Sequence, residues 1–123
     1  MQDFRKLAVW EKSHQFVLAV YDGTSDFPVE ERYGLTSQLR RCAVSIPSNI
    51  AEGCGRGGQA DFARFLQMAL GSASEAEYQL LHGRDLGFLA DSSYEAIITR
   101  VYEIKRMLTA LIKRVRGDDQ TEN

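Results

Sequence analysis

The sequence predicts an all-α protein, an antiparallel four-helix bundle with up-down-up-down order. Apolar residues recur at spacings of three and four along four long segments, which is the pattern of helices that each bury one face. No segment alternates apolar and polar residues over the length of a strand. The connections between the four segments are short, so neighbouring helices are expected to run antiparallel.

Length and composition set the expected domain organisation. A chain of 123 residues with two prolines can form one continuous core, and it is too short for two independent ones. We expect one bundle domain over residues 1–117 and a polar, disordered tail over residues 118–123. The sequence opens on charged residues, and no apolar run approaches the roughly 20 residues of a membrane span. The expectation is a cytoplasmic protein with reduced thiols and no membrane partner.

The first helix is predicted over residues 4–21. Its main buried face is expected to hold the residues at alternating spacings of three and four, which are Leu7, Trp10, His14, Val17 and Tyr21. A second row lies on a neighbouring face and holds Val9, Phe16 and Val20. Together the two rows are wider than one core contact requires. We therefore predict that this helix buries a second side against another subunit.

A glycine cluster separates the second helix from the third. The second helix is predicted to begin near Val29 or Tyr33, and Pro47 removes a backbone donor inside it, which predicts a kink. Four glycines between residues 53 and 58 end this helix, and the third starts near Gln59. The expected core row of the second helix is Leu35, Leu39, Cys42, Ile46 and Ile50. The row of the third is rich in small residues: Phe62, Leu66, Ala69, Ala73, Ala76 and Leu80.

The ends of the third and fourth helices carry their own signals. Gly87 follows the last periodic residue of the third helix and is predicted to be a left-handed cap. Ser92 and Glu95 have the spacing of a capping box, which predicts the start of the fourth helix. Gly117 is expected to stop that helix. Its apolar row keeps the helical spacing over three heptads: Tyr94, Ile97, Val101, Ile104, Leu108, Leu111 and Val115.

No group of residues has the composition of an active site. His14 and His82 have no Cys or carboxylate at ligand spacing, so His14 is interpreted as a hydrogen-bonded histidine of the core or of an interface. Cys42 is predicted in the core and Cys54 at the surface, too far apart on one helix for a disulfide. The glycine cluster lacks the strand and the Lys-Ser/Thr pair of a phosphate-binding loop. We predict no catalytic residue, no cofactor and no metal.

Basic residues gather along the second half of the fourth helix and at one point of the second helix. A helix C-terminus attracts cations, so a solvated basic face is the simplest interpretation. The alternative is contact with an acidic partner or with nucleic acid. The candidate contact residues are Arg40, Arg41, Arg100, Lys105, Arg106, Lys113, Arg114 and Arg116.

Three polar residues lie around the kink predicted at Pro47, namely Ser48, Asn49 and Glu52. They can satisfy carbonyl groups that Pro47 leaves without a donor, or bond to a neighbouring helix. The alternative is a small polar binding site. We favour the structural interpretation.

Several longer motifs make the chain similar to a known family. They are FRKLAVW at residues 4–10, YGL at 33–35, QLRRCAVSIPSNIAEG at 38–53 and FARFL at 62–66. The sequence resembles the 23S rRNA intervening-sequence protein family over most of its length. The resemblance implies a four-helix bundle that assembles into a homopentameric ring, and it supplies no catalytic residues.

The same resemblance extends to the accessory variability determinant of diversity-generating retroelements. That branch implies binding to a reverse transcriptase and to nucleic acid, and it is markedly basic, whereas the net charge of this chain is −2. Two hypotheses follow. The leading one is a non-enzymatic homopentameric scaffold or adaptor that docks a protein or RNA partner. The alternative is a nucleic-acid-binding accessory protein acting with RNA or a reverse transcriptase, with weak, electrostatic RNA or DNA binding.

Overall fold

A computed structural model describes residues 2–122, and the side chains of residues 2–117. Four α-helices account for most of the chain: α1 (Ala8–Gly23), α2 (Leu35–Cys54), α3 (Gln59–Asp85) and α4 (Asp91–Glu122). Two 3-10 turns precede α1 and α2, namely η1 (Phe4–Lys6) and η2 (Val29–Glu31). No strand occurs between residues 2 and 122. The all-α fold class predicted from the sequence is confirmed.

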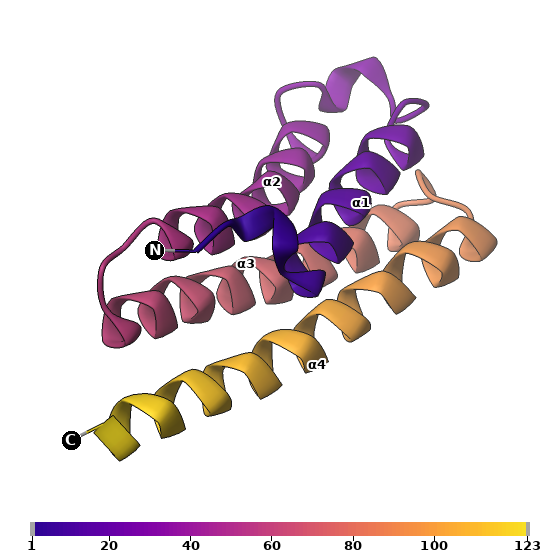
Figure 1. Cartoon of the computed structure of the whole chain (residues 1–123). Coiled ribbons are helices and arrows are strands. Elements are labelled where there is room, and N and C mark those ends of the chain that lie inside the picture. Colours follow the sequence, from indigo (N-terminus) through magenta and orange to yellow (C-terminus); the bar gives the residue numbers. More distant parts are fainter. Residues whose placement is uncertain (1, 123) are drawn as a thin grey trace.

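The helices run antiparallel in chain order and close into a bundle (Figure 1). α3 packs between α2 and α4, and α1 packs against the outer two, α2 and α4. α1 has 16 residues, whereas α3 has 27 and α4 has 32. At 1.5 Å per residue, α1 is therefore about half as long as α4. η1, which precedes α1, lies against α2. Just before η1, the Gln2 N–H donates to the Cys54 carbonyl at the end of α2, at 3.2 Å.

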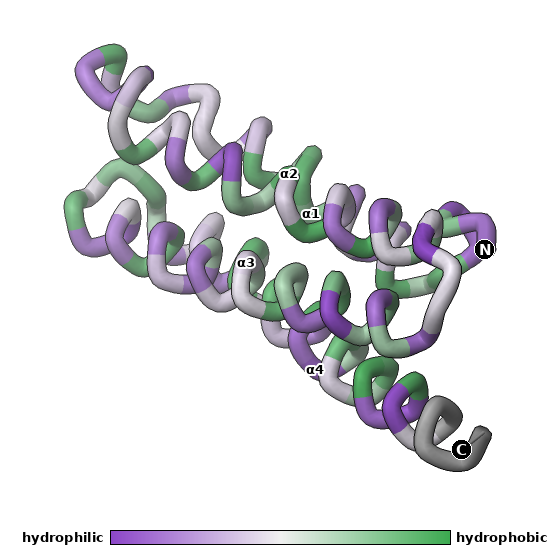
Figure 2. The backbone as a smooth tube through the Cα atoms, turned by 90° about the vertical axis from the view of Figure 1, so that its left-hand side faces the viewer, coloured by the Kyte–Doolittle hydropathy of each residue, from purple (hydrophilic) through white to green (hydrophobic). Residues whose placement is uncertain are grey.

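The core rows predicted for α2, α3 and α4 are confirmed, because every residue named for them is buried. Apolar and polar residues recur along all four helices in Figure 2, as the spacing required. In α3 the middle of the row is alanine, and Ala69, Ala73 and Ala76 are completely buried. Small side chains at these positions let the α3 backbone approach its neighbours closely.

The prediction for α1 was wrong in its choice of face. The row that enters the core holds Val9, Phe16 and Val20, with Val17 at its edge and Ser13 buried between them. The Ser13 hydroxyl donates to the Val9 carbonyl at 2.7 Å, so this polar group needs no further partner. Apart from Val17, the row expected to be the main core face is half-buried or exposed instead. Both rows have helical spacing, and only the positions of α2 and α4 decide between them.

Some helix ends agree with the sequence, including the start of α3 at Gln59, and others differ. Gly87 has a φ of 81°, and the Phe88 and Gly87 N–H groups donate to the Gly83 and Arg84 carbonyls, both at 2.9 Å. This is the left-handed cap that was predicted. α2 begins at Leu35, later than expected. α4 begins at Asp91, so Ser92 lies in its first turn rather than at the cap position.

α4 continues past Gly117 to Glu122, where the sequence predicted a stop. One glycine in a helix costs only about 1 kcal/mol relative to alanine, which need not end a long helix. Pro47 also lies inside a continuous helix, since α2 extends to Cys54.

Candidate functional site

The basic residues of α4 do not form one surface. At 100° per residue, Arg106, Lys113 and Arg116 share the side of α4 that faces away from the core, and all three are exposed. A shallow hollow on this side is lined by Arg106, Lys113 and Lys105 around Thr109 and Ala110. We call Arg106, Lys113 and Arg116 the outer basic row. Arg100 and Arg114 lie on the opposite flank of the helix, toward α1.

Part of the charge on α4 serves to connect helices. The Lys105 Nζ lies 2.8 Å from a Glu77 carboxylate oxygen of α3, and both side chains are about two-thirds buried. On the other flank, the Lys12 Nζ of α1 lies 3.2 Å from Glu103. These two pairs bring α4 into register with α3 and α1. Lys105 therefore has a structural role that its position in the basic cluster did not reveal.

Arg40 and Arg41 are neighbours in sequence and point to different helices. The Arg40 guanidinium donates to the Thr24 hydroxyl at 2.8 Å and to the Tyr21 carbonyl at 3.3 Å, and it lies 4.5 Å from the centre of the Tyr21 ring. It thus closes the C-terminus of α1, where unpaired carbonyls remain. Arg41 is exposed and lines a shallow groove between α2 and α3 with Glu75.

The polar residues near Pro47 do not converge on one site. The Asn49 amide donates to the Ser45 carbonyl at 2.8 Å and to its hydroxyl at 3.0 Å, and Ser45 is bonded in turn to Ser72 of α3 at 2.8 Å. Glu52 pairs with Arg56 at the surface, 3.2 Å away, and Ser48 is exposed. Asn49 therefore holds Ser45 within α2, and only Ser45 reaches α3.

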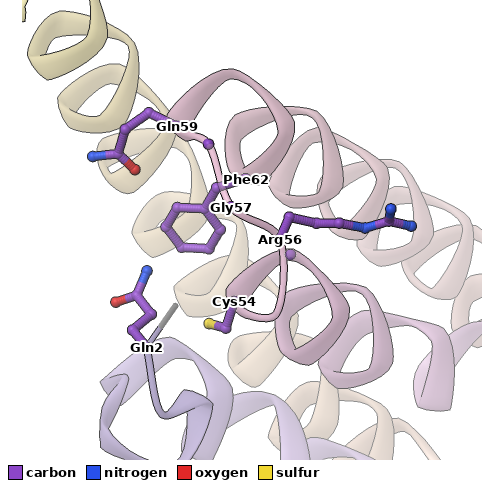
Figure 3. A pocket seen from close by; sticks show the side chains of 8 residues that line it. Gln2, Cys54, Arg56, Gly57, Gln59 and Phe62 are labelled. Carbon is purple, nitrogen blue, oxygen red and sulfur yellow. The ribbon is translucent and has the colours of Figure 1, made fainter.

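The glycine-rich turn encloses a cavity of about 220 Å³ between α2, α3 and the N-terminal segment. Figure 3 shows the Arg56 side chain extending away from the space between Gln2 and Phe62. No cation therefore faces this cavity from the turn itself. Cys54, expected at the surface, is buried at 2 % exposure, because the N-terminal segment covers it. That contact is non-local, and the local sequence gave no sign of it.

The two histidines make aromatic contacts. His14 is exposed and stacks on Trp10 with ring centres 5.2 Å apart, so of its two predicted places, core or interface, the core is wrong. His82 stacks on Tyr78 at 5.9 Å. Among the residues that the structure describes, no three His, Cys, Asp or Glu side chains gather as metal ligands do. No described helix is long and apolar enough to cross a bilayer.

Burial, and after it the nearby Glu75 carboxylate, together raise the pKa of the Cys42 thiol from 9.0 to about 12. A thiol with such a pKa stays protonated near neutral pH, and it is therefore a poor nucleophile. The thiol also donates to the Leu39 carbonyl at 3.3 Å. Cys42 is a core residue, as predicted.

An exposed apolar row runs along the face of α1 that turns away from the core. Leu18 is 56 % exposed and Tyr21 is 43 % exposed, and Trp10 and His14 continue the row toward the start of the helix. Val44 of α2 is 38 % exposed and lies one helical turn after Arg40, whose guanidinium contacts the Tyr21 ring. We call these five residues the α1 apolar face. Trp10, His14 and Tyr21 come from the row that the sequence placed on the main buried face of the first helix, whereas Leu18 and Val44 were not predicted.

A second feature, which sequence reasoning missed, is an apolar hollow between the start of α1 and the second half of α4. Its volume is about 280 Å³. Arg114 at the rim is its one polar lining residue. The apolar lining residues are Leu7, Ala8, Val9, Met107, Ala110 and Leu111. The hollow needs α1 and α4 to be neighbours, and only the folded chain brings them together.

Taken together, these features define a small antiparallel helical-bundle protein with exposed apolar and basic surfaces and no convergent group of catalytic side chains among its described residues. The chain belongs to the 23S rRNA-intervening sequence protein family, whose model matches residues 5–110. It is similar to a crystal structure of a protein of unknown function from the S23 ribosomal protein family of Bacteroides thetaiotaomicron VPI-5482. The TM-score is 0.79 and the identity 28%, over 85% of this chain and 95% of that one. No curated protein matches the sequence.

Proposed function

We propose that this protein is a non-enzymatic homo-oligomeric scaffold or adaptor of the cytoplasm. The observation that carries the proposal is the α1 apolar face. Trp10, Leu18 and Tyr21 lie along one side of a helix, with Val44 on α2, and a monomer leaves them partly in water. Contiguous exposed apolar surface is typical of protein–protein contacts, in which aromatic residues are enriched.

The chemistry of the rest of the surface agrees with a non-enzymatic role. Neither the cavity at the glycine-rich turn nor the apolar hollow between α1 and α4 is lined by a nucleophile beside a base. The raised pKa of the Cys42 thiol keeps it protonated near neutral pH. An assembly of five subunits is the number that the family resemblance implies. A ring of five requires two unlike faces on each subunit, of which the α1 apolar face would be one.

Sedimentation equilibrium at micromolar concentration tests the proposal. The wild-type chain should give a species near five subunits, and Leu18→Glu should dissociate it, because a carboxylate would have to be desolvated in the interface. Tyr102→Glu is the matched control: Tyr102 is 44 % exposed, on α4, and the change should leave the assembly intact. A monomeric wild-type chain would refute the proposal, and dissociation by the α4 variant alone would place the interface elsewhere.

A second candidate function is weak nucleic-acid binding, as an accessory protein that acts with RNA or a reverse transcriptase. The observation that favours it is the outer basic row, since Arg106, Lys113 and Arg116 have no ion pair among the described residues. Three cations on one side of a helix can contact phosphates without reading sequence. The net charge of −2 opposes such binding at long range.

A further inference from the structure

The apolar hollow between α1 and α4 has only one polar lining residue, unlike the other cavities described among residues 2–117. Val9 and Leu111 form its buried floor, and Leu7 and Met107 are half-buried walls. The space exists because the rim positions of the two helices are small: Ala8 and Ala110 line it on opposite sides. Pockets lined by apolar side chains with one fixed polar group are the usual form of small-ligand sites.

The single polar group of this hollow is a cation. Arg114 has no hydrogen bond or ion pair among the residues that the structure describes, and no acidic residue lines the hollow. Two described carboxylates about one helical turn from the hollow are engaged with other groups. Glu103 pairs with Lys12 at 3.2 Å, and Glu11 accepts a hydrogen bond from the Gln15 amide at 3.5 Å. The guanidinium at the rim is therefore free to bind an anion.

We propose that this hollow binds a carboxylate attached to a short apolar chain, with the chain between α1 and α4 and the carboxylate on Arg114. The guanidinium offers a planar fork that matches the two oxygens of a carboxylate. The apolar chain gains by leaving water, at about 0.8 kcal/mol for each buried methylene. A volume near 280 Å³ suits a small ligand rather than a nucleotide cofactor. A free fatty acid of medium length has this chemistry, and so does a peptide that ends in Leu.

The proposal is tested by titrating the full chain with butanoate, hexanoate and octanoate, and following backbone amide shifts by NMR. Shifts should centre on Met107 and Ala110, and each two-carbon extension should tighten binding by about 15-fold until the hollow is filled. Hexanol should bind about 3- to 10-fold more weakly than hexanoate, because it lacks the charge.

Two variants and a control separate the contributions. Arg114→Gln should remove the preference for hexanoate over hexanol. Ala110→Leu should abolish binding by filling the space, while Arg100→Gln, on the same helix outside the hollow, should change nothing. A peptide ending in Leu is titrated as the free acid and as the amide, which lacks the carboxylate. If the peptide acid binds more tightly than octanoate, the ligand is a peptide C-terminus; if octanoate binds more tightly, it is a fatty acid. No saturable shifts at Met107 and Ala110 with either ligand, or equal affinity for hexanoate and hexanol in the wild type, would overturn the proposal.

Discussion

At the scale of single residues, the buried alanines of α3 set how closely the helices approach. Ala73 is completely buried in the middle of the α3 core row. Ala73→Leu adds three heavy atoms to a close helix contact, so we expect a destabilisation of about 1–3 kcal/mol. Urea denaturation measures it. Ala60→Leu, at an exposed alanine of the same helix, should stay within about 0.5 kcal/mol of the wild type. Equal effects of the two changes would mean that Ala73 is not in a tight contact.

The Cys42 thiol makes the stability of the folded chain depend on pH. In the folded chain its pKa is about 12, whereas its ordinary value is 9.0. Between these values only the unfolded chain releases the proton, so rising pH favours unfolding. The contribution of the protonated thiol is complete below pH 9.0 and is lost as the pH approaches about 12.

We therefore expect the free energy of unfolding to fall more steeply in the wild type than in Cys42→Ala between about pH 7 and pH 10.5. Urea denaturation at the two pH values gives the comparison. Cys42→Ser should have the same shallow slope as the alanine variant, since neither titrates, although the two differ in packing. Parallel slopes for all three chains would show that the thiol does not titrate differently on folding.

At the scale of elements, local signals predicted what local interactions decide. The core rows of α2, α3 and α4 follow from spacing alone, and the Gly87 cap follows from the need for a positive φ. The face of α1 could not be chosen from spacing, because both of its rows are helical and a neighbouring helix decides which one is buried. Cys54 was misplaced for the same reason, since the segment that covers it comes from the other end of the predicted fold.

The candidate site was predicted only in part. The basic residues were found by composition, and helical phase divides them between two flanks of α4. Arg40 and Lys105 have partners in other helices, Thr24 and Glu77 respectively, which no sequence pattern indicated. The apolar hollow required the pairing of α1 with α4, a contact between residues about a hundred positions apart. Surfaces made by distant segments are the part that sequence reasoning misses.

Gly87 ends α3 with a left-handed backbone conformation. Its φ of 81° lies in the region that side chains rarely adopt, so Gly87→Ala should destabilise the chain by about 1–2 kcal/mol. Gly87→Asn should cost less, because Asn tolerates this conformation. The control is Gly71→Ala, since nothing lies within 4 Å of the added Cβ, and it should stabilise α3 by about 0.5–1 kcal/mol. Thermal unfolding measures all three. A neutral Gly87→Ala would mean that the α3–α4 turn relaxes to another conformation.

At the scale of the whole molecule, charge is distributed unevenly around a mildly acidic chain. The outer basic row gives α4 one cationic side, while the net charge of each subunit is −2. In an assembly, the number of outer basic rows and the total negative net charge both increase with the number of subunits. Short-range attraction to phosphates then competes with long-range repulsion, and salt is the variable that separates the two.

We expect any nucleic-acid binding to be weak, non-specific and lost with salt. Contact of Arg106, Lys113 and Arg116 with three phosphates predicts a loss of about 40-fold in affinity for duplex DNA between 50 and 200 mM salt, from a slope near −0.9 per phosphate. Titration of labelled RNA and duplex DNA at the two salt concentrations measures this. Changing all three residues to Ala should abolish the low-salt binding, whereas changing Arg41, Arg56 and Arg100 to Ala removes the same charge elsewhere and should reduce it less. Binding that survives at the higher salt, or that prefers one RNA sequence, would favour a specific nucleic-acid role over the scaffold. Equal losses in the two triple variants would show that total charge acts, rather than the outer basic row.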